Sequence, residues 1–199
     1  AMNSLLRPGD AKYRDLDGDG KLTASDRTFL GSPHPAFFGG ITNAVSYRGF
    51  TLSVFADFTT GHKVFNGVRV LGENGHYNTW QLKTMVNRYR PGRPSNEYVR
   101  ANFTTNSHNS QVSSNVIERG DFLRLNNVTL AYQLPAAWVG KLGLQAAQVS
   151  LSGNNLYIWT AYRGSNPETS TRPEALSQGQ DLGSYPLSRT FLARLNLTF

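Results

Sequence analysis

Cysteine is absent from this chain of 199 residues, which excludes a disulfide framework and a thiolate metal site. Only four histidines occur, none paired at a metal-ligand spacing, so a zinc or haem enzyme is not expected. Charged residues amount to only 17%, and no apolar run approaches the ~20 residues of a membrane-spanning helix. Residues 1–6 lack the basic start and apolar core of a signal peptide. Their Ala-Met opening is typical of an expression scar, and hence of an excised piece of a longer protein.

Aromatic residues make up 12% of the chain, and glycine occurs 19 times. This composition favours a β-rich protein over a helical bundle or a disordered tail. The net charge of +7 would suit nucleic acid, but the basic residues are spread out, without a polybasic run or an RNA-binding aromatic motif. We therefore expect no nucleic-acid partner.

Apolar and polar residues alternate with a period of two in several segments, which predicts β-strands. The alternation is clear from Phe37 to Tyr47 and from Phe50 to Thr59, and the intervening Arg48-Gly49 is typical of a tight hairpin. The same alternation returns in three later segments. The predicted strands are 37–47, 50–59, 122–133, 146–156 and 188–199, with a weaker candidate at 63–71.

The polar side of these strands carries mainly Ser, Thr, Asn and Gln, with few Lys or Glu. Strands of ~9–11 residues with one apolar and one mildly polar face suit a tilted outer-membrane strand, because lipid contacts the first face and a hydrated lumen the second. The pattern favours an all-β fold of antiparallel up-and-down strands from a transmembrane β-barrel. The alternative is a soluble β-sandwich, acting as a carbohydrate-binding module with a structural calcium ion.

Short and long links alternate between the predicted strands, as in barrels with short periplasmic turns and long extracellular loops. If Phe199 lies at the periplasmic end, then Arg48-Gly49 and Leu134–Gln145 are periplasmic links. We therefore expect an extracellular loop region at 1–36 and the barrel strands within 37–199. The predicted extracellular loops between strands are 60–121 and 157–187.

The C-terminal residue Phe199 follows alternating apolar residues, and this ending resembles the signature by which the barrel-assembly machinery recognises outer-membrane strands. Tyr and Trp rings suit the membrane interface, because such a ring can be half wet. Five of them stand at or just beyond the ends of predicted strands: Tyr47, Tyr132, Trp138, Tyr157 and Trp159.

The segment from Asp15 to Asp26 is the most specific local motif. Oxygen donors at positions 1, 3 and 5, a glycine at 6 and a carboxylate at 12 follow the spacing of a Ca²⁺-binding loop. Repulsion among the acidic groups favours a bound cation, and an Asp/Gly-rich solvated turn without an ion is the alternative. The predicted ligands are Asp15, Asp17, Asp19, Lys21 through its carbonyl, Thr23 and Asp26.

Groupings that could support catalysis are sparse, and we expect no enzyme. Ser32, His34 and Asp26 are close in sequence, but the chain has no Gly-x-Ser-x-Gly elbow. Four acidic residues could form glycosidase-type pairs, although nothing fixes their separation: Glu73, Glu97, Glu118 and Asp121. Five aromatic residues of the predicted outer loops could stack on sugar rings or simply pack within the loops: Tyr77, Trp80, Tyr89, Trp159 and Tyr162.

Collinear motifs cover most of the chain, and only about 72–115 looks idiosyncratic. They are Pro8–Asp10, Asp15–Pro35, Tyr47–Phe55, Ile117–Leu130, Leu142-Gly143, Ser152–Leu156, Asp181–Pro186 and Arg189–Phe199. Together they resemble the C-terminal part of the SusC/RagA-type TonB-linked outer-membrane receptors.

This resemblance implies a large barrel with an internal plug in the outer membrane of a Gram-negative bacterium. Such a receptor takes up oligosaccharides or peptides with energy from TonB, and a SusD-like surface lipoprotein closes over it. The chain would supply only the last strands, with the plug and the TonB-contacting segment N-terminal to it. Because five or six strands cannot close such a barrel, the isolated chain would expose two edges and an apolar face, and we expect it to oligomerise, to need detergent or to repack.

Overall fold

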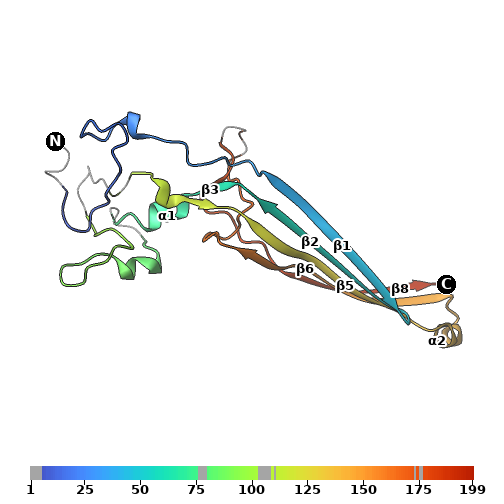
Figure 1. Cartoon of the computed structure of the whole chain (residues 1–199). Helices are drawn as coiled ribbons and strands as arrows, with labels where there is room; N and C mark the ends of the chain where they lie inside the picture. Colours follow the sequence, from blue (N-terminus) through green and yellow to red (C-terminus); the bar gives the residue numbers. More distant parts are fainter. Residues whose placement is uncertain (1–5, 76–79, 103–108, 110, 173, 175–176) are drawn as a thin grey trace. The chain divides into compact units, whose positions relative to one another are not determined.

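The computed structural model describes residues 6–75, 80–102, 109, 111–172, 174 and 177–199 (Figure 1). The chain forms two compact units, each assembled from segments that are far apart in the sequence. We call them the loop unit and the sheet unit. The loop unit comprises Ala1–Gly31, Val64–Glu118 and Ser170–Gly183, and the sheet unit comprises Ser32–Lys63, Arg119–Thr169 and Ser184–Phe199.

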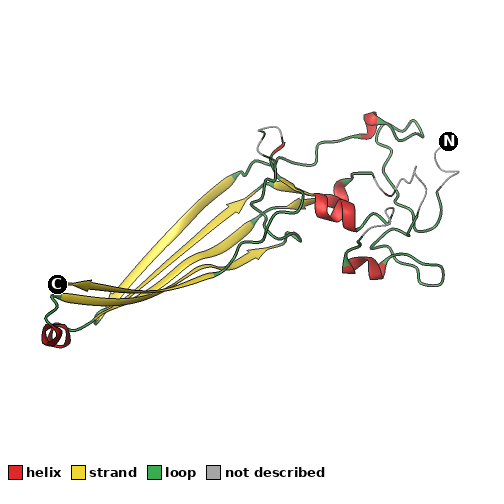
Figure 2. Ribbon diagram, turned by 180° about the vertical axis from the view of Figure 1, so that it is seen from behind, coloured by secondary structure: helices red, strands yellow, loops and turns green. Residues whose placement is uncertain are grey.

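The sheet unit is built on a five-stranded antiparallel meander with the order β1-β2-β5-β6-β8 (Figures 1 and 2). Its strands are β1 Phe37–Tyr47, β2 Phe50–Thr60, β5 Phe122–Gln133, β6 Ala146–Thr160 and β8 Thr190–Thr198. The predicted all-β fold of antiparallel up-and-down strands is confirmed. β6 continues past the predicted end at 156, because its last residues still pair with the start of β5.

The cross-strand register places apolar side chains of all five strands in common rows on one face of the sheet. One row contains Tyr47, Phe50, Tyr132, Val149 and Leu195, and the next contains Val45, Leu52, Leu130, Leu151 and Ala193. Successive side chains of a strand point to opposite faces. The Ser, Thr and Asn residues between these positions therefore form the other face.

A β-bulge at Asn126 changes the alternation within β5. The register of β5 against β2 shifts at this point, so that Asn126 is an extra residue in its strand. As a result, Leu123 and Leu125 lie on the same face as Val128, although their positions in the sequence differ in parity. Alternation in the sequence alone would have placed these two leucines on the polar face.

One end of the sheet carries the Arg48-Gly49 turn, the Leu134–Gln145 link and the end of β8. Arg48 and Gly49 have φ angles of 47° and 84°, as a two-residue hairpin turn requires. A side chain at Gly49 would meet the carbonyl oxygen of Gln133 at 3.0 Å, so the turn lies against the end of β5. The amide of Gln145 donates to the carbonyl of Thr198 (2.8 Å). The link itself folds into α2 (Ala136–Val139) and the 3₁₀ turn η6 (Gly140–Leu142).

The loop unit contains a small sheet with the order β4-β3-β7, in which β3 and β7 are parallel. The weak strand predicted at 63–71 is wrong beyond Asn66. The Asn66 side chain accepts a hydrogen bond from the Arg69 amide (3.1 Å) and thereby caps a helix. The strands are β3 Lys63–Asn66, β4 Ile117–Arg119 and β7 Gln180–Asp181, with helix α1 at Gly67–Gly72 and 3₁₀ turns η2 at Ala24–Asp26, η3 at Lys83–Asn87 and η5 at Ser114–Val116.

Among the helices of the described residues, none has the length and apolar character needed to pass through a bilayer.

Candidate functional site

The apolar face of the sheet unit is exposed. Ile41 and Leu195 keep 69% and 61% of their accessible surface, and large apolar residues of every strand share this exposure. The strands of the sheet unit form a single layer in the described part of the chain. A soluble sandwich would bury these side chains between two sheets, so the sandwich alternative finds no support in this fold.

The opposite face carries mainly short polar side chains, several of which hydrogen-bond across neighbouring strands, together with a few apolar ones such as Phe38, Phe55 and Leu192. The Ser46 and Thr51 hydroxyls are 2.9 Å apart between β1 and β2, and the Thr129 and Ser152 hydroxyls are 2.8 Å apart between β5 and β6. The Asn127 amide donates to the Asn154 side-chain oxygen (2.7 Å). Such pairs stabilise a sheet while leaving a polar surface that water can wet.

A charged cluster on the same polar face joins β2 to β5. Arg124 donates to the Asp57 carboxylate through Nη2 (2.6 Å) and Nε (3.2 Å). The bulged residue Asn126 donates to the same carboxylate (2.9 Å), and Glu168 accepts from Arg124 Nη1 (2.8 Å). The sequence carries no local signal for this cluster, because Asp57 and Arg124 are 67 residues apart.

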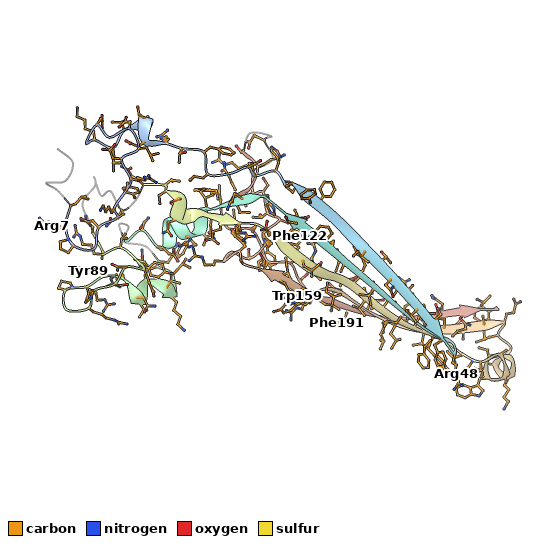
Figure 3. The ribbon with its side chains drawn as sticks, viewed as in Figure 1. Arg7, Arg48, Tyr89, Phe122, Trp159 and Phe191 are labelled. Carbon is orange, nitrogen blue, oxygen red and sulfur yellow. The ribbon has the colours of Figure 1, made fainter. Side chains whose placement is uncertain are left out.

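Aromatic rings gather near both ends of the apolar face. Phe50 and Tyr132 stack at 4.3 Å beside the Arg48-Gly49 turn. Near the opposite end of the sheet, the rings of Tyr157 and Trp159 are 4.7 Å apart, and the register aligns Trp159 with Leu123 on the apolar face (Figure 3). Trp159 therefore lies where an interfacial ring would lie, on the face opposite the polar surface.

The other aromatic residues proposed as sugar platforms sit in separate local packings. Trp80 is exposed and borders the backbone of Gly72, whereas Tyr89 covers Gly9. Tyr162 is buried, and Tyr77 lies outside the described residues. Their role in ligand binding stays a prediction.

The acidic loop brings three of its predicted ligands together. Asp15, Asp17 and Asp19 each offer one carboxylate oxygen, and these oxygens lie within 4.8 Å of one another. Backbone amides turn the loop around Asp15, which accepts from Gly18 (2.7 Å) and Gly20 (2.8 Å). This convergence of hard oxygen donors fits the ligand preference of Ca²⁺.

Asp26, the last residue of the acidic motif, forms hydrogen bonds with the backbone of the loop. Its carboxylate accepts from the amides of Leu16 and Thr23, both at 2.7 Å, and these bonds hold the pKa of Asp26 below its ordinary value. With Thr23 it forms a capping box on η2. The amide of Asp19 lowers the pKa of Asp17, but desolvation and the nearby carboxylates of Asp19 and Asp26 outweigh it and leave this pKa raised.

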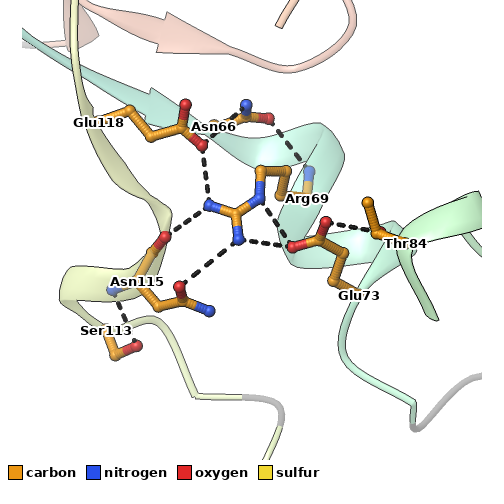
Figure 4. A network of polar contacts seen from close by, with 7 residues as sticks. All are labelled: Asn66, Arg69, Glu73, Thr84, Ser113, Asn115 and Glu118. Carbon is orange, nitrogen blue, oxygen red and sulfur yellow. Dashed lines mark hydrogen bonds and ion pairs between the residues drawn. The ribbon is translucent and has the colours of Figure 1, made fainter. Parts of the chain in front are cut away.

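A buried guanidinium organises the loop unit, and it is not among the site residues that the sequence predicts. Arg69 is 4% exposed and forms ion pairs with Glu73 (2.6 Å) and Glu118 (2.8 Å) (Figure 4). Its Nη1 also donates to the carbonyl of Asn115 (2.6 Å). Burial lowers the pKa of Arg69, but its hydrogen bonds with the two glutamates raise it more. The i, i+4 spacing of Arg69 and Glu73 is a signal for a helix that carries this ion pair, although the alternation of residues 63–71 predicts a strand there.

The acidic residues considered as glycosidase pairs have structural partners instead. Glu73 and Glu118 share Arg69, and Asp121 accepts from Arg119 (2.6 Å) and from the amide of Gly61 (2.6 Å). Glu97 accepts from Asn87 (3.4 Å). The Ser32 hydroxyl accepts a hydrogen bond from the amide of His34, and this bond belongs to a local turn.

Comparison with known proteins gives a consistent result, although no protein-family model matches the chain. TonB-dependent receptors P3 and P26 of Formosa agariphila are 32% and 33% identical to it over 96% of this chain and 19% and 20% of their own lengths. TonB-dependent receptor SusC of Bacteroides thetaiotaomicron is 23% identical over 97% of this chain and 18% of its own.

A solved structure of the RagAB peptide importer in the closed-closed state has a similar fold. The TM-score is 0.76 at 25% identity, over 93% of this chain and 20% of that one. The chain thus spans about a fifth of the length of the proteins that it matches.

Proposed function

We propose, from the confirmed homology of this chain to SusC/RagA-type TonB-dependent receptors, that it forms barrel wall and extracellular loops of an outer-membrane nutrient receptor. The observation that carries the proposal is the two-faced, single-layer sheet. One face presents exposed apolar rows, and the other presents hydroxyl and amide pairs. Lipid outside and a hydrated lumen inside satisfy both faces at once.

The activity and partners of the whole receptor belong to this proposal, because the chain covers only part of it. The cargo is an oligosaccharide or a peptide, taken up across the outer membrane of a Gram-negative bacterium. A SusD-like surface lipoprotein covers the receptor, and TonB acts on segments outside this chain. Phe199 directly follows the last strand, β8, and marks it for the barrel-assembly machinery. We assign no catalytic role to the chain.

A charge on the apolar face tests the proposal. In the full-length receptor, Leu130→Lys or Leu195→Lys would put an ammonium group against acyl chains. The cost is ~2–4 kcal/mol at the middle of the bilayer and about 0–1 kcal/mol near its edges, so it should be larger for Leu130 than for Leu195, which lies in the last apolar row before the Arg48-Gly49 turn. We expect less receptor in the outer membrane and a smaller fraction with the heat-modifiable migration of a folded barrel.

Neighbouring residues on the polar face provide matched controls. Ala131→Lys and Asn196→Lys place the same charge one residue further along the same strands, where it can reach the lumen. These variants should assemble nearly as well as the unmodified receptor. Normal assembly of Leu130→Lys and Leu195→Lys would refute a lipid-facing surface.

We further propose that the acidic loop binds a structural Ca²⁺ through Asp15, Asp17 and Asp19, with Lys21, Thr23 and Asp26 as the remaining predicted ligands. The clustered carboxylates support this assignment. Titration calorimetry of the chelator-treated full-length receptor with CaCl₂ should detect a site with a Kd of roughly 10⁻⁴ M, as in extracellular modules. The triple variant Asp15→Asn, Asp17→Asn and Asp19→Asn should lose that site, while Glu174→Gln should keep it. Equal titrations of all three proteins would rule out the assignment.

A further inference from the structure

We infer that the end of the sheet formed by the Arg48-Gly49 turn and the α2–η6 segment binds the headgroups of anionic phospholipids. The inference rests on the proposed membrane location of the sheet. It adds a specific lipid site, made by named side chains, to the general contact between the apolar face and acyl chains.

The α2–η6 segment exposes apolar side chains that a water-facing turn would not need. Val139 is 2% exposed and anchors the segment, whereas Trp138 and Leu142 keep 61% and 74% of their surface. Gly143 ends the segment with a φ of 71°, and the Leu144 amide returns to the Val139 carbonyl (3.2 Å). The segment is thus fixed by its own hydrogen bonds while two large apolar groups point away from its core.

The hairpin turn adds a cation and further rings at the same end. The guanidinium of Arg48 lies 5.2 Å from the ring centroid of Tyr47, and the next residue of the sheet, Phe50, stacks on Tyr132. Because Gly49 has no side chain, this turn can lie against the end of β5. The α2–η6 segment follows β5 in the sequence, so it begins at the same end of the sheet. Figure 3 shows Arg48 at this end of the sheet unit.

Charge is distributed unevenly along the sheet. No Asp or Glu occurs in 37–56, 125–156 or 188–199, whereas Arg48 and Lys141 lie at the turn end. Both are exposed, and neither has a carboxylate partner among the residues that the structure describes. The acidic groups of the sheet unit, such as Asp57 and Asp121, belong to the other end of the strands.

These features fit a phospholipid headgroup better than a protein partner. The exposed rings of Tyr47 and Phe50 lie in an apolar row of the sheet, and the exposed Trp138 and Leu142 belong to the segment that follows β5 at the same end, so the occupant must meet acyl chains and a polar layer together. Trp and Tyr rings with nearby basic residues are the side chains that anchor proteins at this boundary. Arg48 and Lys141, which form no ion pair within the described residues, select a negatively charged headgroup, at about a factor of five for each basic residue.

Native mass spectrometry of the full-length receptor, with equal amounts of phosphatidylglycerol and phosphatidylethanolamine, tests the inference. The variant combines Arg48→Asn, which keeps a residue suited to the left-handed turn, with Lys141→Gln. We expect it to bind phosphatidylglycerol about twenty-five-fold more weakly at one site, and so to retain one molecule fewer. Binding of phosphatidylethanolamine should not change.

The control variant, Lys12→Gln with Lys83→Gln, removes two exposed cations of the loop unit and should retain the full number of lipids. Unchanged phosphatidylglycerol binding in an assembled Arg48→Asn/Lys141→Gln receptor would overturn this inference alone. An equal loss in the control would overturn it as well, because the effect would then follow net charge. An unmodified receptor that does not assemble in membranes would instead refute the proposed function.

Discussion

Removal of the Arg69 guanidinium should loosen the loop unit strongly and locally. The side chain is 4% exposed and neutralises Glu73 and Glu118, which are both 8% exposed. In Arg69→Ala the two carboxylates keep their other hydrogen bonds, from Thr84 to Glu73 and from Asn66 to Glu118. They lose the shared cation, however, and a buried charge without its partner is costly.

The expected loss is about 3–5 kcal/mol, the usual result of breaking a buried ion pair from one side. The Arg119–Asp121 pair offers a control, because the Arg119 side chain is 71% exposed. Solvent-exposed ion pairs contribute about 0–1 kcal/mol to stability, so Arg119→Ala should change the free energy of unfolding little. Arg69→Lys keeps the charge but loses the planar arrangement of donors that serves both glutamates. Its loss of stability should therefore lie between those of Arg69→Ala and Arg119→Ala.

Amide hydrogen exchange of the full-length receptor measures this local stability. In Arg69→Ala, amides of α1 and of the segment 113–119 should exchange roughly 10²–10⁴-fold faster, while amides of β5 and β6 keep their protection. Protection of α1 equal to that in Arg119→Ala would refute the reasoning, because it would mean that the buried pairs contribute no more than an exposed pair.

Two other perturbations address the N-terminal segment and the bulge. Burial raises the pKa of Asp10, but hydrogen bonds from Arg100, the Arg7 amide and Asn109 outweigh burial and leave this pKa below 3.8. The ionised carboxylate therefore contributes its full stabilisation above the unfolded pKa of 3.8. This contribution is lost as the pH falls through the folded pKa. Limited proteolysis near residue 10 should therefore accelerate on acidification in the unmodified receptor, and Asp10→Asn should already be cleaved quickly at neutral pH. Deletion of Asn126 should leave Leu125 on the apolar face and Arg124 on the polar face, because it removes the extra residue that the bulge accommodates, so the folded, heat-modifiable form should persist; loss of that form would contradict the assignment of Asn126 as the extra residue.

Local patterns were sufficient for much of the sheet. The bounds 37–47 and 122–133 coincide with β1 and β5, because a strand with one apolar and one polar face alternates residue by residue on either side of a bulge. The Arg48-Gly49 turn was also predictable, since a two-residue link between two alternating segments favours a tight hairpin turn, and both residues have the positive φ angles that such a turn requires. The pattern failed at 67–71, where the Asn66 cap and the Arg69–Glu73 spacing supported a helix.

The sequence by itself determined the period of the strands, the tight hairpin and the spacing of the acidic loop, because each depends on residues within about a dozen positions of one another. Only the tertiary structure decided that Asn126 is an extra residue, that Arg124 meets Asp57 and that Arg69 joins Glu73 to Glu118. The physical reason is separation along the chain: which charges become neighbours is settled by strand register and burial.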